Sequence, residues 1–193
     1  TFEKLMKAIS KSLKKNDPNH LNLGIRYGYI EQLDDELLRI SKESFDALSF
    51  NCYALSPDHE KMNHALEISG LPMIIGEYHF GTVDRGLAQS LWQVNSQKER
   101  GDAFRYYTEN AFAHRGLIGT GWFRWIDQNI NGRTDGENYN CGFIDVTDRP
   151  YPYMVDAAIK TAKSLYEIHS GTKTPFHQAP NAVGHSPIPD LWE

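Results

Sequence analysis

The sequence lacks the features that mark several classes of protein. Its 193 residues carry 20 Lys and Arg against 25 Asp and Glu, so no positive excess is available to neutralise nucleic-acid phosphates. The longest apolar run, at residues 71–75, is interrupted by Pro72 and is far shorter than the roughly 18 residues that a membrane helix needs. Neither a nucleic acid nor a membrane is therefore expected as a partner.

Cysteines and glycine-rich loops are equally scarce. Cys52 and Cys141 have no metal-ligand spacing and form no disulfide framework, so two separate thiols are expected, although the sequence does not decide whether they pair. His59, His64 and His114 fall in or at the ends of helical segments, so no metal site is expected. The pattern Gly-x-Gly-x-x-Gly does not follow the first expected strand, and no cofactor is expected.

What the chain does contain is a regular alternation of short apolar runs and longer amphipathic ones. Strands are expected at residues 21–27, 47–53, 72–78 and 117–123. Helices are expected at residues 2–13, 34–44, 58–69, 97–114 and 153–169. This alternation predicts right-handed parallel βαβ units of the α/β class. Since a full (β/α)₈ barrel needs roughly 250 residues, we predict half of a barrel, with an open doubly wound sheet as the alternative.

Both ends of the chain carry a further expectation. The first helix places five apolar residues on one stripe, Phe2, Leu5, Met6, Ile9 and Leu13, with lysines opposite. A chain that starts within such a helix resembles a cut polypeptide. We expect one partial domain over residues 1–170, followed by an extended tail at residues 171–193 on the domain surface, where four prolines occur.

In parallel α/β folds, function lies at the carboxyl ends of the strands. Polar, aromatic and charged side chains occupy those positions here, where structural turns would show mostly Gly, Asn, Asp and Pro. The candidate site residues selected in this way are Arg26, Asn51, Tyr53, Glu77, His79, Trp122, Trp125, Asp127 and Gln128. Glu137 joins them from the polar loop that follows the last expected strand.

Glu77 is the residue of this set whose possible chemical role is clearest. It follows two β-branched residues and Gly76, so its carboxylate would emerge at the mouth of a barrel, where it could attack an anomeric carbon. A general base or a strand-end ion pair are the other interpretations. His79 faces the same side as Glu77 and could bind substrate or restrain the carboxylate. The hydroxyl of Tyr53 could hold Glu77 ionised.

Aromatic residues, at 12% of the chain, favour a sugar ligand because a flat ring can stack on a sugar's apolar face. Trp122 and Trp125 surround one strand end. One of them is expected to pack in the core, and we predict Trp122 as the sugar platform, with Trp125 next. Asp127, Gln128 and Glu137 would recognise hydroxyl groups, although a solvated loop would explain such a charge cluster equally well.

Several blocks of the sequence, at residues 75–86, 122–128 and 132–151, have a distinctive pattern of glycine, aromatic and acidic residues. They resemble the C-terminal part of glycoside hydrolase family 50, the β-agarases, and residues 23–26 and 49–53 resemble the fifth and sixth strands of that family's barrel. The resemblance implies the C-terminal half of a (β/α)₈ TIM barrel, strands 5 to 8, and a retaining mechanism with two glutamates. Glu77 would be the nucleophile, and the acid/base glutamate would lie before Thr1.

The same resemblance implies the partners and the location. The substrate would be a galactan oligosaccharide or polysaccharide such as agarose, and the missing N-terminal half-barrel would be a second partner, without which the chain is expected to be inactive. The enzyme would be secreted or periplasmic. Tyr78 and Arg124 depart from the family pattern, and Arg124 could favour an anionic or sulfated galactan or pair with Asp127. A non-catalytic carbohydrate-binding barrel and a related β-galactosidase or mannanase remain the alternatives.

Overall fold

The computed structural model describes residues 1–184, which form two compact units. Unit 1 comprises residues 1–52, 58–76 and 116–121, and unit 2 comprises residues 53–57, 77–115 and the chain from residue 122 onward. Within the described residues, no helix combines the length and the apolar character that a membrane crossing requires.

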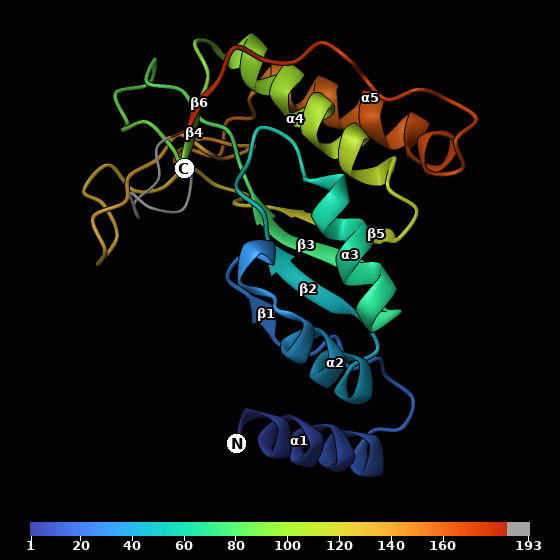
Figure 1. Cartoon of the computed structure of the whole chain (residues 1–193). Helices are drawn as coiled ribbons and strands as arrows, with labels where there is room; N and C mark the ends of the chain where they lie inside the picture. Colours follow the sequence, from blue (N-terminus) through green and yellow to red (C-terminus); the bar gives the residue numbers. More distant parts are fainter. Residues whose placement is uncertain (185–193) are drawn as a thin grey trace. The chain divides into compact units, whose positions relative to one another are not determined.

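Unit 1 is built on a four-stranded sheet in the order β1-β2-β3-β5 (Figure 1). The strands are β1 (Arg26–Tyr27), β2 (Leu48–Asn51), β3 (Met73–Tyr78) and β5 (Leu117–Trp122). Strands β1 and β2 run parallel. The Leu48 amide donates to the Pro72 carbonyl, and the Met73 amide donates to the Gly116 carbonyl. Further along both strands, Gly121 lies against the Gly76 carbonyl. The neighbouring strands β2 and β3, and β3 and β5, therefore also run in the same direction. The predicted α/β class with a parallel sheet is confirmed.

The helices of unit 1 are α1 (Phe2–Asn16), α2 (Asp35–Ser44) and α3 (His59–Ser69), with a 3₁₀ turn, η1 (Ile30–Gln32). Side-chain caps explain where two of them begin, because Asp34 accepts from the Leu37 amide at 2.8 Å and Asp58 accepts from the Glu60 amide at 2.9 Å. Helix α3 ends at Gly70, whose φ of 67° lies in the left-handed region. The boundaries of α2 and α3 match the predicted ones within one residue, whereas α1 ends at Asn16, three residues beyond the predicted range.

One expectation for unit 1 was wrong in extent. The strand predicted at residues 21–27 is reduced to Arg26–Tyr27, because Asn22 instead bonds across to Ser44 and Asp46 and Gly24 turns the chain with a φ of 72°. On α1, Met6 alone of the five stripe residues is buried, where it packs with Ile40 and Phe45. The apolar periodicity identified the helix correctly, and the other four residues of the stripe are exposed.

Unit 2 contains α4 (Gln97–Phe112) and α5 (Pro152–His169), which pack side by side (Figure 1). Gly101 allows this close approach, because a Cβ atom there would lie 2.6 Å from the carbonyl oxygen of Tyr153. Two short strands that the sequence did not predict, β4 (Trp92–Gln93) and β6 (Val183–Gly184), pair antiparallel. The last residues of β3 and β5 also belong to this unit.

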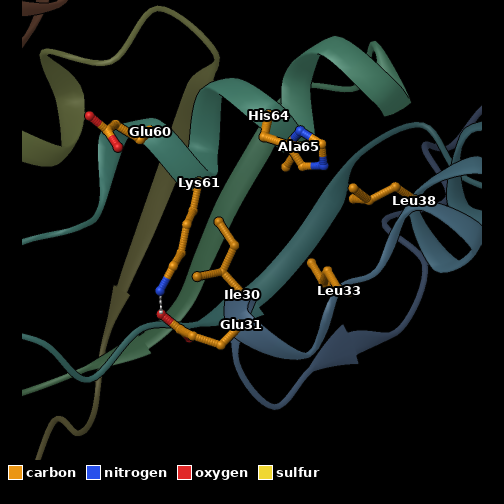
Figure 2. Close-up of a pocket in the computed structure, with 8 residues that line it drawn as sticks. All are labelled: Ile30, Glu31, Leu33, Leu38, Glu60, Lys61, His64 and Ala65. Atoms are coloured by element: carbon orange, nitrogen blue, oxygen red, sulfur yellow. Dashed lines mark hydrogen bonds and ion pairs between the residues drawn. The ribbon is translucent and has the colours of Figure 1, made fainter. Parts of the chain in front are cut away.

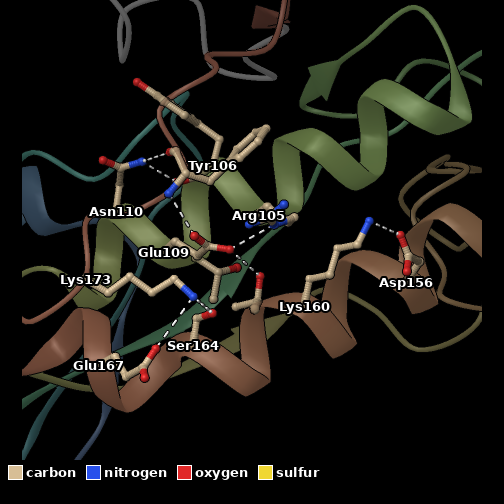
Figure 3. A network of polar contacts seen from close by, with 12 residues as sticks. Arg105, Tyr106, Glu109, Asn110, Asp156, Lys160, Ser164, Glu167 and Lys173 are labelled. Atoms are coloured by element: carbon tan, nitrogen blue, oxygen red, sulfur yellow. Dashed lines mark hydrogen bonds and ion pairs between the residues drawn. The ribbon is translucent and has the colours of Figure 1, made fainter.

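The segment from residue 171 to residue 184 is attached to α4 and α5 by a buried polar network (Figure 3). Glu109, which is 1% exposed, accepts from Arg105 Nε at 2.9 Å, from Thr161 Oγ1 at 3.1 Å and from the Phe176 amide at 2.8 Å. Asn110 donates to the Phe176 carbonyl at 3.1 Å. The predicted tail also includes residues 185–193, which lie outside the described range, so the domain boundary at residue 170 stays a prediction.

Candidate active site

Glu77 and Tyr53 form the centre of the candidate site in unit 2. Glu77 is partly exposed near the end of β3, whereas Tyr53 is 6% exposed. The Tyr53 hydroxyl donates a hydrogen bond to Oε2 of Glu77 at 2.8 Å, the contact expected from the sequence. Burial, with the negative charge of Glu77 beside it, raises the pKa of Tyr53 far above its usual range. Tyr53 therefore stays protonated and acts as a permanent donor to one oxygen of the carboxylate.

His79 lies directly beside this pair but has no free nitrogen. Its Nδ1–H donates to the Phe123 carbonyl at 3.0 Å, and its Nε2 accepts from the Leu91 amide at 3.1 Å. The ring is 1% exposed and meets the Tyr53 ring edge to face at 4.9 Å. Burial lowers the pKa of His79 to about 3, so the imidazole is neutral at ordinary pH. Both ring nitrogens are occupied by protein partners, and a role of His79 in binding substrate or restraining Glu77 stays a prediction.

The two tryptophans have opposite environments. Trp122 donates from Nε1 to the Cys141 carbonyl at 2.6 Å and packs edge to face against Tyr78 and Phe104. Trp125 is 65% exposed, and its ring stacks on Phe143 with centroids 5.7 Å apart. Trp122 is half-buried and Trp125 is exposed, so neither ring lies in the fully buried core. Trp125 presents the more open face, and the choice of Trp122 as the sugar platform stays a prediction.

Asp127 belongs to a buried charged network. It is 3% exposed, and its carboxylate accepts from the Gly142 amide at 2.7 Å, from Tyr151 Oη at 2.6 Å and from Asn140 Nδ2 at 2.8 Å. Arg100 is fully buried, donates to the Asn140 and Gly142 carbonyls at 2.8 and 2.9 Å, and stacks over the Tyr151 ring. Burial lowers the pKa of Arg100, and Asp127 opposes that effect. The network holds the segment 139–143 in place; direct contact of Asp127 with a sugar stays a prediction.

Gln128 and Glu137 meet in the loop after β5. Gln128 is fully buried, accepts from the Tyr139 amide through Oε1 at 2.7 Å and donates from Nε2 to Oε2 of Glu137 at 2.6 Å. Arg133 lies 3.3 Å from the same oxygen of Glu137. The structure thus brings together Tyr53, Glu77 and His79 in one set of contacts and Gln128 with Glu137 in another.

Arg26 and Asn51 lie in unit 1, at the start of β1 and the end of β2. A Cβ atom on Gly76 would lie 2.3 Å from Cδ of Arg26 and 3.3 Å from Oδ1 of Asn51. Any larger residue at position 76 would displace the Arg26 side chain, which lies against this glycine. Both predicted residues are adjacent to the strand that carries the carboxylate.

Arg100 and Asn140 are site-supporting residues that the sequence reading missed. Arg100 sits within an amphipathic helix and Asn140 within a polar loop, so neither position carries a pattern that distinguishes it from a surface residue. Arg100 and Asn140 are 40 residues apart in the sequence, and local periodicity gives no sign of a contact over that separation. Among the described residues, no group of three or more His, Cys, Asp or Glu is placed to hold a metal ion.

One hollow in unit 1 is separate from the predicted site residues of that unit. It has a volume of about 280 Å³ and lies between η1, α2 and α3, with Ile30, Leu33 and Leu38 on its apolar wall (Figure 2). Lys61 spans it to reach Glu31 at 3.1 Å. It contains neither Arg26 nor Asn51.

Comparison with known proteins identifies relatives of the chain. No family model matches it. Beta-agarase A of Vibrio sp. (strain JT0107) is 37% identical over 165 residues, which are 82% of this chain and 16% of that protein. Beta-agarase B of the same organism is 35% identical over 170 residues, 84% of this chain and 17% of that protein.

The solved structure of the agarase AgWH50C is 36% identical, with a TM-score of 0.81 over 86% of this chain and 26% of that one. The chain thus spans about a sixth of the length of the curated relatives and about a quarter of that solved structure. Both the sequence blocks and the fold point to the same group of proteins. The chain belongs to glycoside hydrolase family 50, in which it corresponds to one part of the β-agarases.

Proposed function

We propose that the protein is a retaining glycoside hydrolase of a β-linked galactan such as agarose, with Glu77 as its nucleophile. The observation that carries the proposal is the 2.8 Å hydrogen bond from Tyr53 to Oε2 of a partly exposed strand-end carboxylate. The names of the related agarases support the substrate class. A polysaccharide substrate fits the expectation of a secreted or periplasmic enzyme, which is part of the proposal.

The chemistry proceeds in two displacements. Glu77 attacks the anomeric carbon of the bound sugar while a second glutamate protonates the leaving glycosidic oxygen, giving a covalent glycosyl ester. Water, deprotonated by that second glutamate, then attacks the same carbon and releases Glu77 with net retention. Tyr53 fixes the plane of the carboxylate by holding Oε2. In this proposal the acid/base glutamate lies outside the present chain, about 5–5.5 Å from Glu77 when the site is assembled.

The proposal includes the finer assignment of the sheet as strands 5 to 8 of a (β/α)₈ barrel. Strands β1 and β5 lie at the edges of the four-stranded sheet and would pair with the strands that complete the barrel. Helix α5 also leaves an apolar stripe exposed at Val155, Ile159 and Tyr166. A further helix of the completed barrel would cover that stripe. Because the acid/base glutamate of this proposal lies outside the chain, the chain alone is expected to be inactive.

Trp125 supplies the sugar-binding surface in this proposal. Its exposed indole is held flat against Phe143, and a rigid aromatic face loses little entropy when a sugar stacks on it. Trp122, which is half-buried, supports the site through its bond to the Cys141 carbonyl.

The test is Glu77→Gln in the full-length protein. Turnover of agaro-oligosaccharides should fall by several orders of magnitude while binding of the same oligosaccharides survives, because the amide cannot act as a nucleophile but keeps the shape of the side chain. Glu67→Gln, in α3, is the matched control and should leave turnover unchanged. Product analysis by NMR should show the β-anomer first.

Full activity of the Glu77→Gln variant would refute the assignment of the nucleophile. A wild-type full-length protein that binds galactan without cleaving it would instead support the non-catalytic carbohydrate-binding barrel. Cleavage of galactosides or mannans in preference to agarose would support the related barrel hydrolases.

A further inference from the structure

The hairpin that joins Gln128 to Tyr139 has a fixed backbone. The Gln128 amide donates to the Tyr139 carbonyl at 3.1 Å, and the Arg133 amide donates to the Glu137 carbonyl at 2.8 Å. Gly136 permits the tight turn with a φ of 88°. The position of Glu137 is therefore set by the hairpin and not by a free loop.

The Gln128 side chain determines how the carboxylate of Glu137 is oriented. Because Oε1 of Gln128 accepts from the Tyr139 amide, its Nε2 must point the other way, toward Oε2 of Glu137 at 2.6 Å. Arg133 adds a positive charge 3.3 Å from the same oxygen. Among the described residues, no donor contacts the other oxygen, Oε1, and the side chain is 27% exposed. Glu137 is thus a pre-oriented acceptor with one oxygen open.

The hairpin that carries Glu137 contacts the segment to which His79 is bonded. The guanidinium of Arg133, which pairs with Glu137, lies over the Phe123 ring, 5.7 Å from its centroid, and the Phe123 carbonyl is the acceptor for His79. Burial raises the pKa of Tyr53 most, the charge of Glu77 follows, and the charge of Glu137 adds a smaller effect in the same direction. Glu137 therefore lies within electrostatic range of Tyr53.

We propose that Glu137 is a specificity-determining residue that accepts hydrogen bonds, through Oε1, from hydroxyl groups of the galactan unit bound beside Glu77, with Gln128 as its positioning residue. The inference rests on the proposed function. A carboxylate can only accept, so its partner must carry a hydrogen. The sugar recognised here is therefore one with free hydroxyls. A galactan O-methylated or sulfated at that position is rejected, because its substituted oxygen and the Glu137 carboxylate are both hydrogen-bond acceptors.

The same geometry suits a carboxylate at position 137. Arg133 compensates the charge of Glu137, so a neutral sugar can bind near Glu77 without an uncompensated charge at position 137. Hydrogen bonds to a charged acceptor are also stronger than those to a neutral one.

The experiment measures binding of a set of monodeoxygenated agaro-oligosaccharides by calorimetry, in the full-length protein carrying Glu77→Gln to prevent turnover. Adding Glu137→Gln should weaken binding of the parent oligosaccharide about 10-fold to 100-fold, the range for a lost hydrogen bond to a charged group. For the analogue that lacks the recognised hydroxyl, the same substitution should have no effect. O-methylated oligosaccharide should bind better to the Glu137→Gln protein than to its parent.

Asp135→Asn is the matched control. Asp135 lies in the same hairpin and also pairs with Arg133, but it serves the turn by accepting from the Glu137 amide at 3.2 Å, a contact that asparagine keeps. Binding should be unchanged. An equal loss for every analogue, or an equal loss for Asp135→Asn, would overturn the inference.

The two proposals fail separately. If wild-type full-length protein does not cleave galactan, the proposed hydrolase fails, while the deoxy-sugar series still reports on Glu137. If cleavage occurs and Glu137→Gln leaves the series unaffected, the role of Glu137 alone is wrong. Gln128→Ala should reproduce the selective loss in weaker form, because it frees the carboxylate to rotate without removing it.

Discussion

The neutral imidazole of His79 makes the stability of unit 2 depend on pH in a defined direction. Burial lowers the pKa of His79 to about 3, whereas an exposed histidine titrates near 6.5. Between these two values the unfolded chain binds a proton that the folded chain does not. The free energy of unfolding must therefore decrease as the pH falls from about 6.5 toward 3.

The magnitude follows from this difference in bound protons. One proton taken up only on unfolding changes the free energy of unfolding by about 1.4 kcal/mol for each pH unit. Over the full window from this single group the loss is on the order of 5 kcal/mol, a large part of the stability of an ordinary domain. Protonation would also place a hydrogen on Nε2, where the Leu91 amide already points a hydrogen at the ring.

The assay compares urea unfolding of wild-type protein and His79→Gln between pH 7 and pH 4.5. Glutamine keeps one donor and one acceptor but does not titrate, so it should be less stable at pH 7 and lose less on acidification. Other groups titrate in both proteins and cancel in the difference, which isolates position 79. His20→Gln is the control, because the His20 side chain is 83% exposed and its loss should leave the slope unchanged.

Equal slopes for wild type and His79→Gln would refute the reasoning. That outcome would mean that His79 binds a proton in the folded state near its ordinary pKa, and hence that water reaches the ring. The bonds to Phe123 and Leu91 would then be too weak to hold the neutral form.

Three further outcomes are expected. Tyr53→Phe in the full-length protein should lower kcat/KM about 10-fold to 100-fold because Glu77 loses a hydrogen bond to its charged form, and steady-state kinetics with an unchanged value would contradict the proposed role. Glu109→Gln should lower Tm by about 4–8 °C and speed hydrogen exchange at the Phe176 amide, because the new NH₂ group opposes a donor; unchanged exchange would argue against the network. Native Cys141 should resist iodoacetamide at pH 8, since burial raises the pKa of its thiol to about 12 and covers it, and modification at the rate of a free thiol would show that the loop opens.

Much of the fold could be predicted because its signals are local. Helices α2 and α3 begin after the capping residues Asp34 and Asp58, and α4 begins after Ser96, which accepts from the Glu99 amide. The strand-end rule also selected Tyr53 and Glu77, whose hydrogen bond the structure contains. A helix cap and a period-two alternation each involve residues only a few positions apart, so both can be recognised from the sequence.

The remaining features depend on contacts between distant segments. Trp122 and Trp125 are three residues apart around a strand end, where no periodicity tells which ring is the more exposed. Trp122 donates to the carbonyl of Cys141, which lies 19 residues further along the chain. Strands β4 and β6 are two residues long and about 90 residues apart, which is too short for any alternation. The exposure of most of the apolar stripe on α1 could not be predicted, because amphipathicity shows that a face is apolar but not what covers it.

The attachment of Phe176 to Glu109 also bears on the order in which the polypeptide is assembled during synthesis. The carboxylate is made 67 residues before the amide that completes its set of donors. When α4 and α5 have just left the ribosome, the Glu109 carboxylate therefore lacks one of its hydrogen bonds. The packing of the two helices is complete only after the later segment has been made. A translational pause placed before that segment should prolong a loosened state, whereas a pause after it should not.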